Sequence, residues 1–213
     1  MLRSSAIHRA LSRCYPLSPS PVGPPAMTRR GLLFTTAVVI LAVTAVEHAH
    51  SQWRTDGELV EESSWRKSVE GFGVMLRVTD DPEGLFAAWD MPASPDYGPS
   101  YSEAETASRG DFVMAFVIFS GCAEDQDGAC DCSVDYTAYF PDGEVYGQQG
   151  GPLWVGHPDP GPGYLQLSEG NIGLRFESDD PFGSYRITAD ITDNVSGTRA
   201  SLATQVTLIS VHD

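Results

Sequence analysis

The sequence carries little positive charge. Its 213 residues include 13 Lys and Arg, and Lys67 is the only lysine among them. There are 29 Asp and Glu residues, so the formal net charge is −16. Surfaces that bind phosphate groups need clustered Lys and Arg. The charge balance therefore argues against nucleic acid or anionic lipid as a partner, and we interpret the acidity as a solvated surface.

The sequence also lacks an apolar run that would span a bilayer comfortably. The most apolar stretch, residues 31–46, is uncharged and follows two arginines, but a transmembrane helix needs about 20 residues. This length is typical of the hydrophobic region of a signal peptide. The small residues Ala49 and Ser51 occupy the −3 and −1 positions of a cleavage site. Cleavage there would make Gln52 the first residue of the mature chain.

These features predict the organisation of the chain. We expect a signal segment at 1–51, a polar lead-in at 52–70 and a single β-sandwich domain at 71–213. Met27, which opens the compact sequence MTRRG, is an alternative start. The predicted location is the periplasm or the extracellular space, with no membrane insertion after signal cleavage. The alternative is a chain tethered to the membrane by an uncleaved anchor at 31–46.

Beyond the lead-in, the sequence has the pattern of short strands. Residues 112–120 are continuously apolar, which favours a strand buried on both faces, whereas 132–140 and 184–192 alternate apolar with polar residues. One short helix is predicted near residues 82–90, because Asp81 can cap it and a proline follows. About seven to nine strands, with turn signals roughly every ten residues, predict an all-β, two-sheet antiparallel sandwich.

Other segments give further expectations. The lead-in should contain a short helical turn, and the region 92–110 should hold an edge strand. Residues 164–167 and 172–176 should form two separate strands. The apolar positions of the last strand change parity after Leu208, which predicts a β-bulge there.

Residues 180–211 resemble the closing hairpin of immunoglobulin-like domains. The sequence DPFGSY, ending at Tyr185, is similar to the turn before their penultimate strand. The resemblance implies that the Tyr185 hydroxyl bonds back to upstream backbone. Ile187 stands where antibody-type domains have a cysteine, and the nearer likeness is to bacterial extracytoplasmic immunoglobulin-like modules. The resemblance implies an immunoglobulin-like sandwich but no particular activity.

Three of the four cysteines lie close together, at Cys122, Cys130 and Cys132. In an oxidising compartment two of them should pair. We predict a Cys122–Cys130 disulfide between the end of one strand and the start of its antiparallel neighbour, with Cys132 as the alternative partner of Cys122. The competing hypothesis is a metal-handling or redox protein that uses all three sulfurs, because thiolates bind Cu(I) and Zn(II).

The loop around these cysteines also contains Asp125, Asp127 and Asp131. Calcium prefers such oxygen ligands, so these residues are candidate metal ligands. The loop lacks the regular spacing and the distal Glu of an EF-hand. We therefore expect no cofactor, with calcium as the alternative.

Candidate binding residues flank a Pro- and Gly-rich loop at 156–163. Trp154, His157 and Tyr164 would form an exposed platform beside it, unless the two aromatic residues pack against the end of the sandwich. The sequence has no Gly-x-Ser-x-Gly motif, which a serine hydrolase of that type would need. The 28 acids beyond residue 51 give carboxylate pairs at any spacing, so such pairs are no evidence for a glycoside hydrolase. We therefore predict a non-enzymatic, exported immunoglobulin-like domain that binds a protein or a polysaccharide in the cell envelope.

Overall fold

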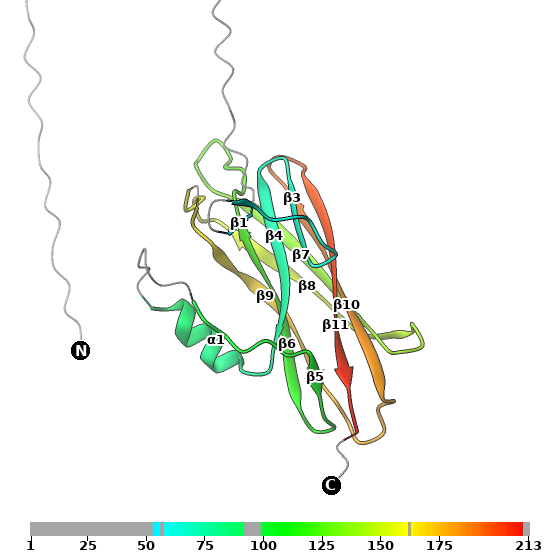
Figure 1. Ribbon diagram of the computed structural model, residues 1–213. Helices are drawn as coiled ribbons and strands as arrows, with labels where there is room; N and C mark the ends of the chain where they lie inside the picture. The colour runs from blue at the N-terminus through cyan, green and yellow to red at the C-terminus, as the bar shows by residue number, and fades with distance from the viewer. Residues whose placement is uncertain (1–52, 56–57, 92–98, 162, 211–213) are drawn as a thin grey trace, which may run out of the picture. The chain divides into compact units, whose positions relative to one another are not determined.

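The computed structural model describes residues 53–55, 58–91, 99–161 and 163–210. The predicted signal segment and cleavage site lie outside this part of the chain. Two sheets account for half of the described residues, and Figure 1 shows them one behind the other. The four-stranded sheet has the order β3 (Arg66–Val69), β4 (Phe72–Thr79), β6 (Phe112–Ser120) and β9 (Gln166–Arg175).

The five-stranded sheet has the order β5 (Thr106–Ala107), β11 (Arg199–Leu208), β10 (Gly183–Asp193), β7 (Asp131–Tyr139) and β8 (Val145–Val155). Its strands pair antiparallel except for β5, which runs parallel to β11. A small hairpin consists of β1 (Arg54–Thr55) and β2 (Glu58–Leu59). With the short helix α1 (Pro82–Trp89), this architecture confirms the predicted all-β sandwich.

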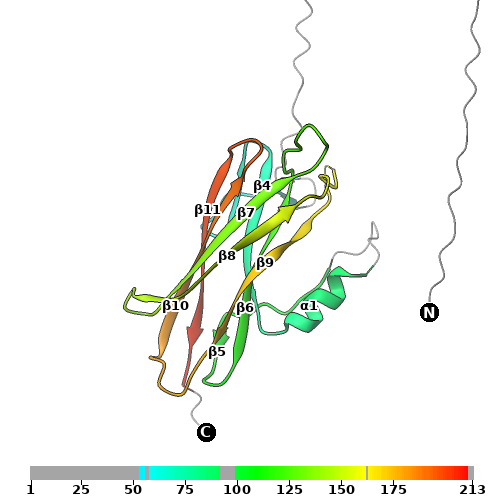
Figure 2. The ribbon, with the colours of Figure 1, turned by 180° about the vertical axis from the view of Figure 1, so that it is seen from behind.

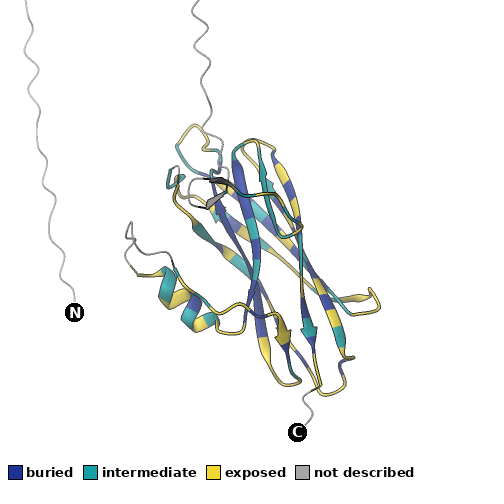
Figure 3. Cartoon of the chain, viewed as in Figure 1, coloured by how far each residue is buried: buried dark blue, intermediate teal, exposed yellow. Residues whose placement is uncertain are grey.

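The alternating strands turn their apolar side chains into the space between the sheets. On β7 and β10 the predicted inward positions are buried: Cys132, Val134, Tyr136, Ala138, Tyr185, Ile187, Ala189 and Ile191. Figure 3 shows buried positions alternating with intermediate and exposed ones along the strands. Burying apolar side chains contributes roughly 25 cal/mol per Å² removed from water, so this layer is the main source of stability.

The strand β6 is buried on both faces, as its continuous apolar sequence predicts. One face joins the core between the sheets, and the other packs against Leu85 of α1. The helix begins as expected, because Asp81 Oδ1 accepts a hydrogen bond of 2.9 Å from the Gly84 backbone N–H. Figures 1 and 2 place α1 beside β6 and β9. Within the described residues, no helix has the length and apolarity to cross a membrane.

Two expectations for the chain before and inside the sandwich need correction. The lead-in contains no described helical turn but holds β1, β2 and β3, and β3 pairs with β4 at a sheet edge. The sequence of β3, RKSV, has no apolar face, and all four of its side chains are half-buried. The two strands expected at 164–167 and 172–176 are one strand, β9. Ser168 bridges the shift in register there, since its Oγ accepts from the Val117 N–H at 3.1 Å.

The remaining two expectations concern sheet edges. The prediction of a β-bulge after Leu208 is wrong. β11 ends at Leu208, so the change of parity marks the end of the strand. Beyond it, the Ile209 backbone N–H donates to the Ala107 carbonyl at 2.9 Å. The edge strand expected within 92–110 is confirmed as β5, a strand of two residues, although residues 92–98 are not described.

Candidate functional site

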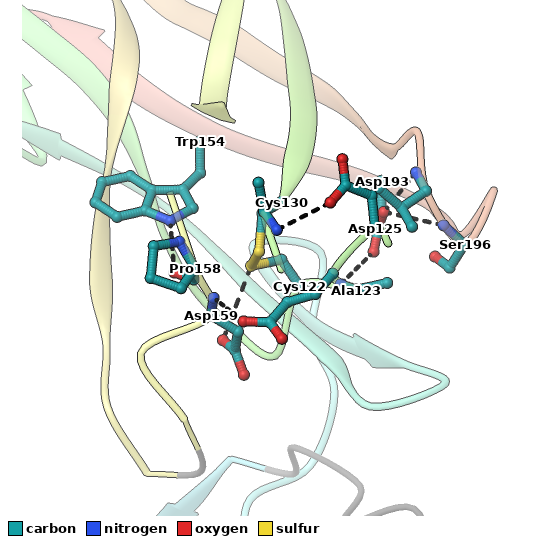
Figure 4. The surroundings of a disulfide bond; sticks show 12 residues. Cys122, Ala123, Asp125, Cys130, Trp154, Pro158, Asp159, Asp193 and Ser196 are labelled. Atoms are coloured by element: carbon teal, nitrogen blue, oxygen red, sulfur yellow. Dashed lines mark hydrogen bonds between the residues drawn. A yellow bond between two sulfur atoms is a disulfide. The ribbon is translucent and has the colours of Figure 1, made fainter. Parts of the chain in front are cut away.

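The predicted Cys122–Cys130 disulfide is present, with Sγ atoms 2.02 Å apart. Cys122 follows β6 and Cys130 precedes β7. The two strands are not the paired neighbours that we expected, because β6 lies in the four-stranded sheet and β7 in the five-stranded one. The bond therefore closes the connection between the two sheets. We call this region the disulfide end; it comprises the disulfide, the loop 156–161 and the residues bonded to them. Figure 4 shows Trp154 and Pro158 on one side of the disulfide and Asp193 with Ser196 on the other.

The loop 156–161 is fixed to the cross-linked segment by its backbone. The Cys130 N–H donates to the His157 carbonyl at 2.7 Å, and the Gly156 N–H donates to the Cys130 carbonyl at 3.0 Å. Farther along, the Asp159 N–H donates to Glu124 Oε1 at 2.9 Å. Three hydrogen bonds therefore hold the loop against the segment that the disulfide closes. The side chains on this loop are thus presented from a rigid support.

The Trp154 side chain contacts both a core residue and an exposed residue. Its ring packs against the buried Phe119, with centroids 5.9 Å apart, and the His157 ring lies 4.6 Å from it. Its Nε1–H donates to the Pro158 carbonyl at 3.2 Å. His157 is exposed, and its Nε2 lies 3.3 Å from Glu169 Oε1, an ion pair when the imidazole is protonated. The structure thus brings two of the three predicted platform residues together.

The third predicted residue, Tyr164, lies on the same connection between β8 and β9. Its side chain is 58% exposed, and its neighbour Leu165 and Val155 at the end of β8 are exposed as well. The alternative that Trp154 packs the end of the sandwich holds for that residue. It does not hold for Tyr164, which adds to an exposed apolar surface around the loop.

A buried carboxylate that the sequence did not single out organises the same end. Asp193 accepts three backbone hydrogen bonds, from Ala123 at 2.8 Å, Val195 at 3.0 Å and Ser196 at 3.1 Å. It is almost completely buried, so these donors replace the water that the carboxylate loses on folding. The Asp193 side chain thereby ties the β10–β11 hairpin to the disulfide segment. In the sequence, residues 193–197, DNVSG, indicated only a hairpin loop at this position.

The three-sulfur hypothesis is not favoured. Two sulfurs form the disulfide, and the third, Cys132, is a buried free thiol. Burial, together with the nearby carboxylates of Asp193 and Asp131, raises the pKa of Cys132 to about 12. A thiol with such a pKa stays protonated at neutral pH, whereas metal binding and redox attack need the thiolate.

Two of the three candidate calcium ligands accept hydrogen bonds within the protein. Asp125 Oδ1 accepts from the Asp127 N–H at 2.8 Å and from the Ala129 N–H at 3.0 Å, and these hydrogen bonds lower the pKa of Asp125. Asp131 Oδ1 accepts from the Asn194 side chain at 3.0 Å. In the part of the chain that the structure describes, no three His, Cys, Asp or Glu side chains are grouped as a metal site. Calcium binding stays a prediction.

A second candidate surface is a groove of about 340 Å³ on the outer face of the five-stranded sheet. Its lining comes from β3 and the segment before it and from β7, β10 and β11, and it is mainly polar: Ser64, Lys67, Tyr139, Arg186, Thr188, Asp190, Ser201, Leu202 and Ala203. The alternation of β10 did predict that Arg186, Thr188 and Asp190 face outward. The sequence gave no signal that the segment before and within β3 would lie beside β11.

No family model and no curated protein sequence matches this chain. Among solved structures, part of a family 123 glycoside hydrolase from Clostridium perfringens matches with 6% identity and a TM-score of 0.38. That match covers 65% of this chain and 28% of the hydrolase. A CARDB domain from Pyrococcus furiosus, solved with di-metal ions, matches with 14% identity and a TM-score of 0.29, covering 50% of this chain and 81% of that domain.

The match to the hydrolase contradicts our prediction that the chain is not an enzyme, and we withdraw that exclusion. The missing serine motif was an insufficient ground for it, because a glycosidase needs only two carboxylates. Likeness at these TM-scores assigns no activity, ligand or metal to this chain. The function has to be argued from its own surfaces.

Proposed function

We propose that this chain is exported and acts as an immunoglobulin-like module that binds a protein or a polysaccharide in the cell envelope. The observation that carries the proposal is the disulfide end. There a segment closed by a disulfide supports a loop that exposes His157, and Tyr164 and neighbouring apolar side chains are exposed beside this loop. Rigid loops with exposed aromatic side chains are typical of binding sites, because little conformational entropy is lost on binding.

The disulfide supports the export part of the proposal. Structural disulfides persist in oxidising compartments and are rare in the cytosol. N-terminal sequencing of the protein recovered from its host tests export directly, and we expect Gln52 as the first residue. A chain that retains the residues before Gln52 and fractionates with the cytosol would contradict the proposed export.

The strand order supports the immunoglobulin-like part. In chain order, β4 and β6 lie in one sheet, β7 and β8 in the other, β9 returns to the first, and β10 and β11 close the second. Strands A, B, C, C′, E, F and G of immunoglobulin-like domains are distributed in the same way. The hydrogen bond predicted for the corner is also present, because the Tyr185 hydroxyl donates to the Pro181 carbonyl at 2.9 Å.

Binding is tested by affinity capture with the tagged full chain from an envelope fraction, followed by identification of bound proteins and sugars. The test variant is the double substitution His157→Ala with Tyr164→Ala, which removes exposed side chains from the loop. The matched control is Phe182→Ala, which removes an exposed aromatic side chain just before β10, away from the disulfide end. The proposal predicts capture by the wild type and the control and loss of capture by the double variant. Equal capture by all three would contradict it.

A further inference from the structure

The groove on the five-stranded sheet is formed by a contact between segments far apart in the sequence. The Ala203 backbone N–H of β11 donates to the Ser64 carbonyl at 2.7 Å, which sets the segment leading into β3 alongside β11. The floor is formed by outward-facing residues of β10 and β11, where Thr188 pairs with Ala203 and Asp190 with Ser201. The volume of about 340 Å³ lies at the small end of the range for small-molecule sites.

The charge of this groove is opposite to that of the chain. Its lining has two cations, Lys67 and Arg186, and one acid, Asp190, so the lining carries a net charge of +1. Among the described residues, no carboxylate forms a salt bridge with either cation. The Arg186 guanidinium lies over the Tyr139 ring, 4.4 Å from its centroid. In a chain with a net charge of −16, two cations without acidic partners in one groove are available to an external anion.

The rest of the lining suits a ligand rich in hydroxyl groups. The Ser201 hydroxyl donates to Asp190 Oδ1 at 2.5 Å, which leaves the second carboxylate oxygen as an acceptor. Ser64 and Thr188 add hydroxyl groups to the same lining. Because Arg186 lies over the Tyr139 ring, stacking of a ligand on that face is blocked. Recognition would therefore depend on hydrogen bonds and charge.

We propose that this groove binds a uronic-acid unit of an acidic polysaccharide. Lys67 and Arg186 would hold the sugar carboxylate, since charge-assisted hydrogen bonds are the stronger ones and a guanidinium matches a carboxylate in geometry. Asp190 would accept a hydrogen bond from a sugar hydroxyl. A net lining charge of +1 matches one carboxylate. This inference goes beyond the proposed function, because it gives the module a second binding surface whose lining shares no residue with the disulfide end.

The test is calorimetric titration of the purified full chain with a tetramer of galacturonate and with the same tetramer after reduction of its carboxyl groups. We expect binding of the acid form and binding at least about tenfold weaker for the reduced form. Lys67→Ala and Arg186→Ala should each weaken binding of the acid form about tenfold. Arg199→Ala is the matched control, because it removes the same charge from β11 at an exposed position outside the groove. It should leave the affinity unchanged within about twofold.

Several results would overturn the inference. They are no binding of the tetramer, equal affinity for its reduced form, an equal loss in the Arg199 control, and preference for a phosphorylated over a carboxylated sugar. If a groove variant fails to fold by circular dichroism, Thr188→Glu places an acid in the groove and must also weaken binding. The His157 and Tyr164 double variant distinguishes the two proposals. Capture that needs those residues while the tetramer does not bind would leave the proposed function standing and overturn only the uronic-acid site.

Discussion

Replacing Cys122 and Cys130 together by alanine should lower the stability of the domain by an amount that the loop length sets. The two residues are eight apart in the sequence, so the closed loop has nine residues. On the chain-entropy model, such a cross-link contributes about 2.5 kcal/mol by restricting the unfolded chain. For a domain of this size, each kcal/mol shifts the Tm by about 2–4 °C. We therefore expect the double variant to melt about 5–10 °C below the wild type.

The assay is thermal unfolding followed by circular dichroism, with and without a reductant. The wild type should lose stability on reduction, whereas the double variant should be insensitive to the reductant. Cys132→Ala is the matched control, because it removes a buried sulfur but no cross-link, and it should keep the response to the reductant. A double variant that melts with the wild type would refute the reasoning. Loss of the reductant response in the Cys132 variant would instead indicate that Cys132 forms the bond.

Three further predictions concern single polar groups, and thermal or urea unfolding checks each of them. Asp193→Ala should lower the free energy of unfolding by about 3 kcal/mol, because it leaves three backbone donors without their acceptor; a loss below about 1 kcal/mol would contradict this role. Tyr185→Phe should cost about 1 kcal/mol for its hydrogen bond to Pro181. Burial raises the pKa of Tyr185 to about 12, so the wild type should also lose stability between about pH 10 and 12 as the folded state resists ionisation. Burial and nearby Glu124 raise the pKa of Asp159, so stability from this group falls as pH rises from 3.8 through the raised pKa. Asp159→Asn should therefore raise the Tm at pH 7 and change it little near pH 3, and an unchanged Tm at pH 7 would contradict the shift.

The sequence predicted those strands in which the spacing of apolar residues matches the faces that are buried. The strand β6 is apolar throughout and buried on both faces, and β10 alternates in sequence and in burial. β3 could not be predicted in this way, because its four residues are half-buried and owe their place to pairing with β4. In β9 the Ser168 side chain replaces a backbone acceptor at the register shift. The polar residues at this shift interrupt the apolar pattern, so the sequence predicted two strands where the structure has one.

The same distinction between local and long-range contacts decides which parts of the candidate sites were predictable. The Cys122–Cys130 pairing was predictable because the two cysteines are eight residues apart, although β6 and β7 do not pair. Trp154 and His157 are likewise close together in the sequence. The role of Asp193 and the groove at Lys67 depend on contacts between segments more than 60 residues apart. Such contacts require the register between strands, which periodicity does not give. A lone lysine in an acidic chain was visible in the sequence, but its partners were not.

The two candidate surfaces differ in charge, so ionic strength separates them. The groove presents Lys67 and Arg186, whereas the disulfide end presents apolar side chains among the acids Glu124, Asp159 and Glu169. Salt screens exposed charges beyond about 10 Å at 0.1 M and beyond about 3 Å at 1 M. Binding of an anionic sugar in the groove should therefore weaken steeply as salt increases. Capture through the disulfide end, where apolar burial contributes most, should persist at high salt, since screening leaves the burial of apolar area in place. A ligand whose capture is lost at high salt and depends on His157 and Tyr164 would contradict this division, because it would place a charge-dependent contact on the apolar surface.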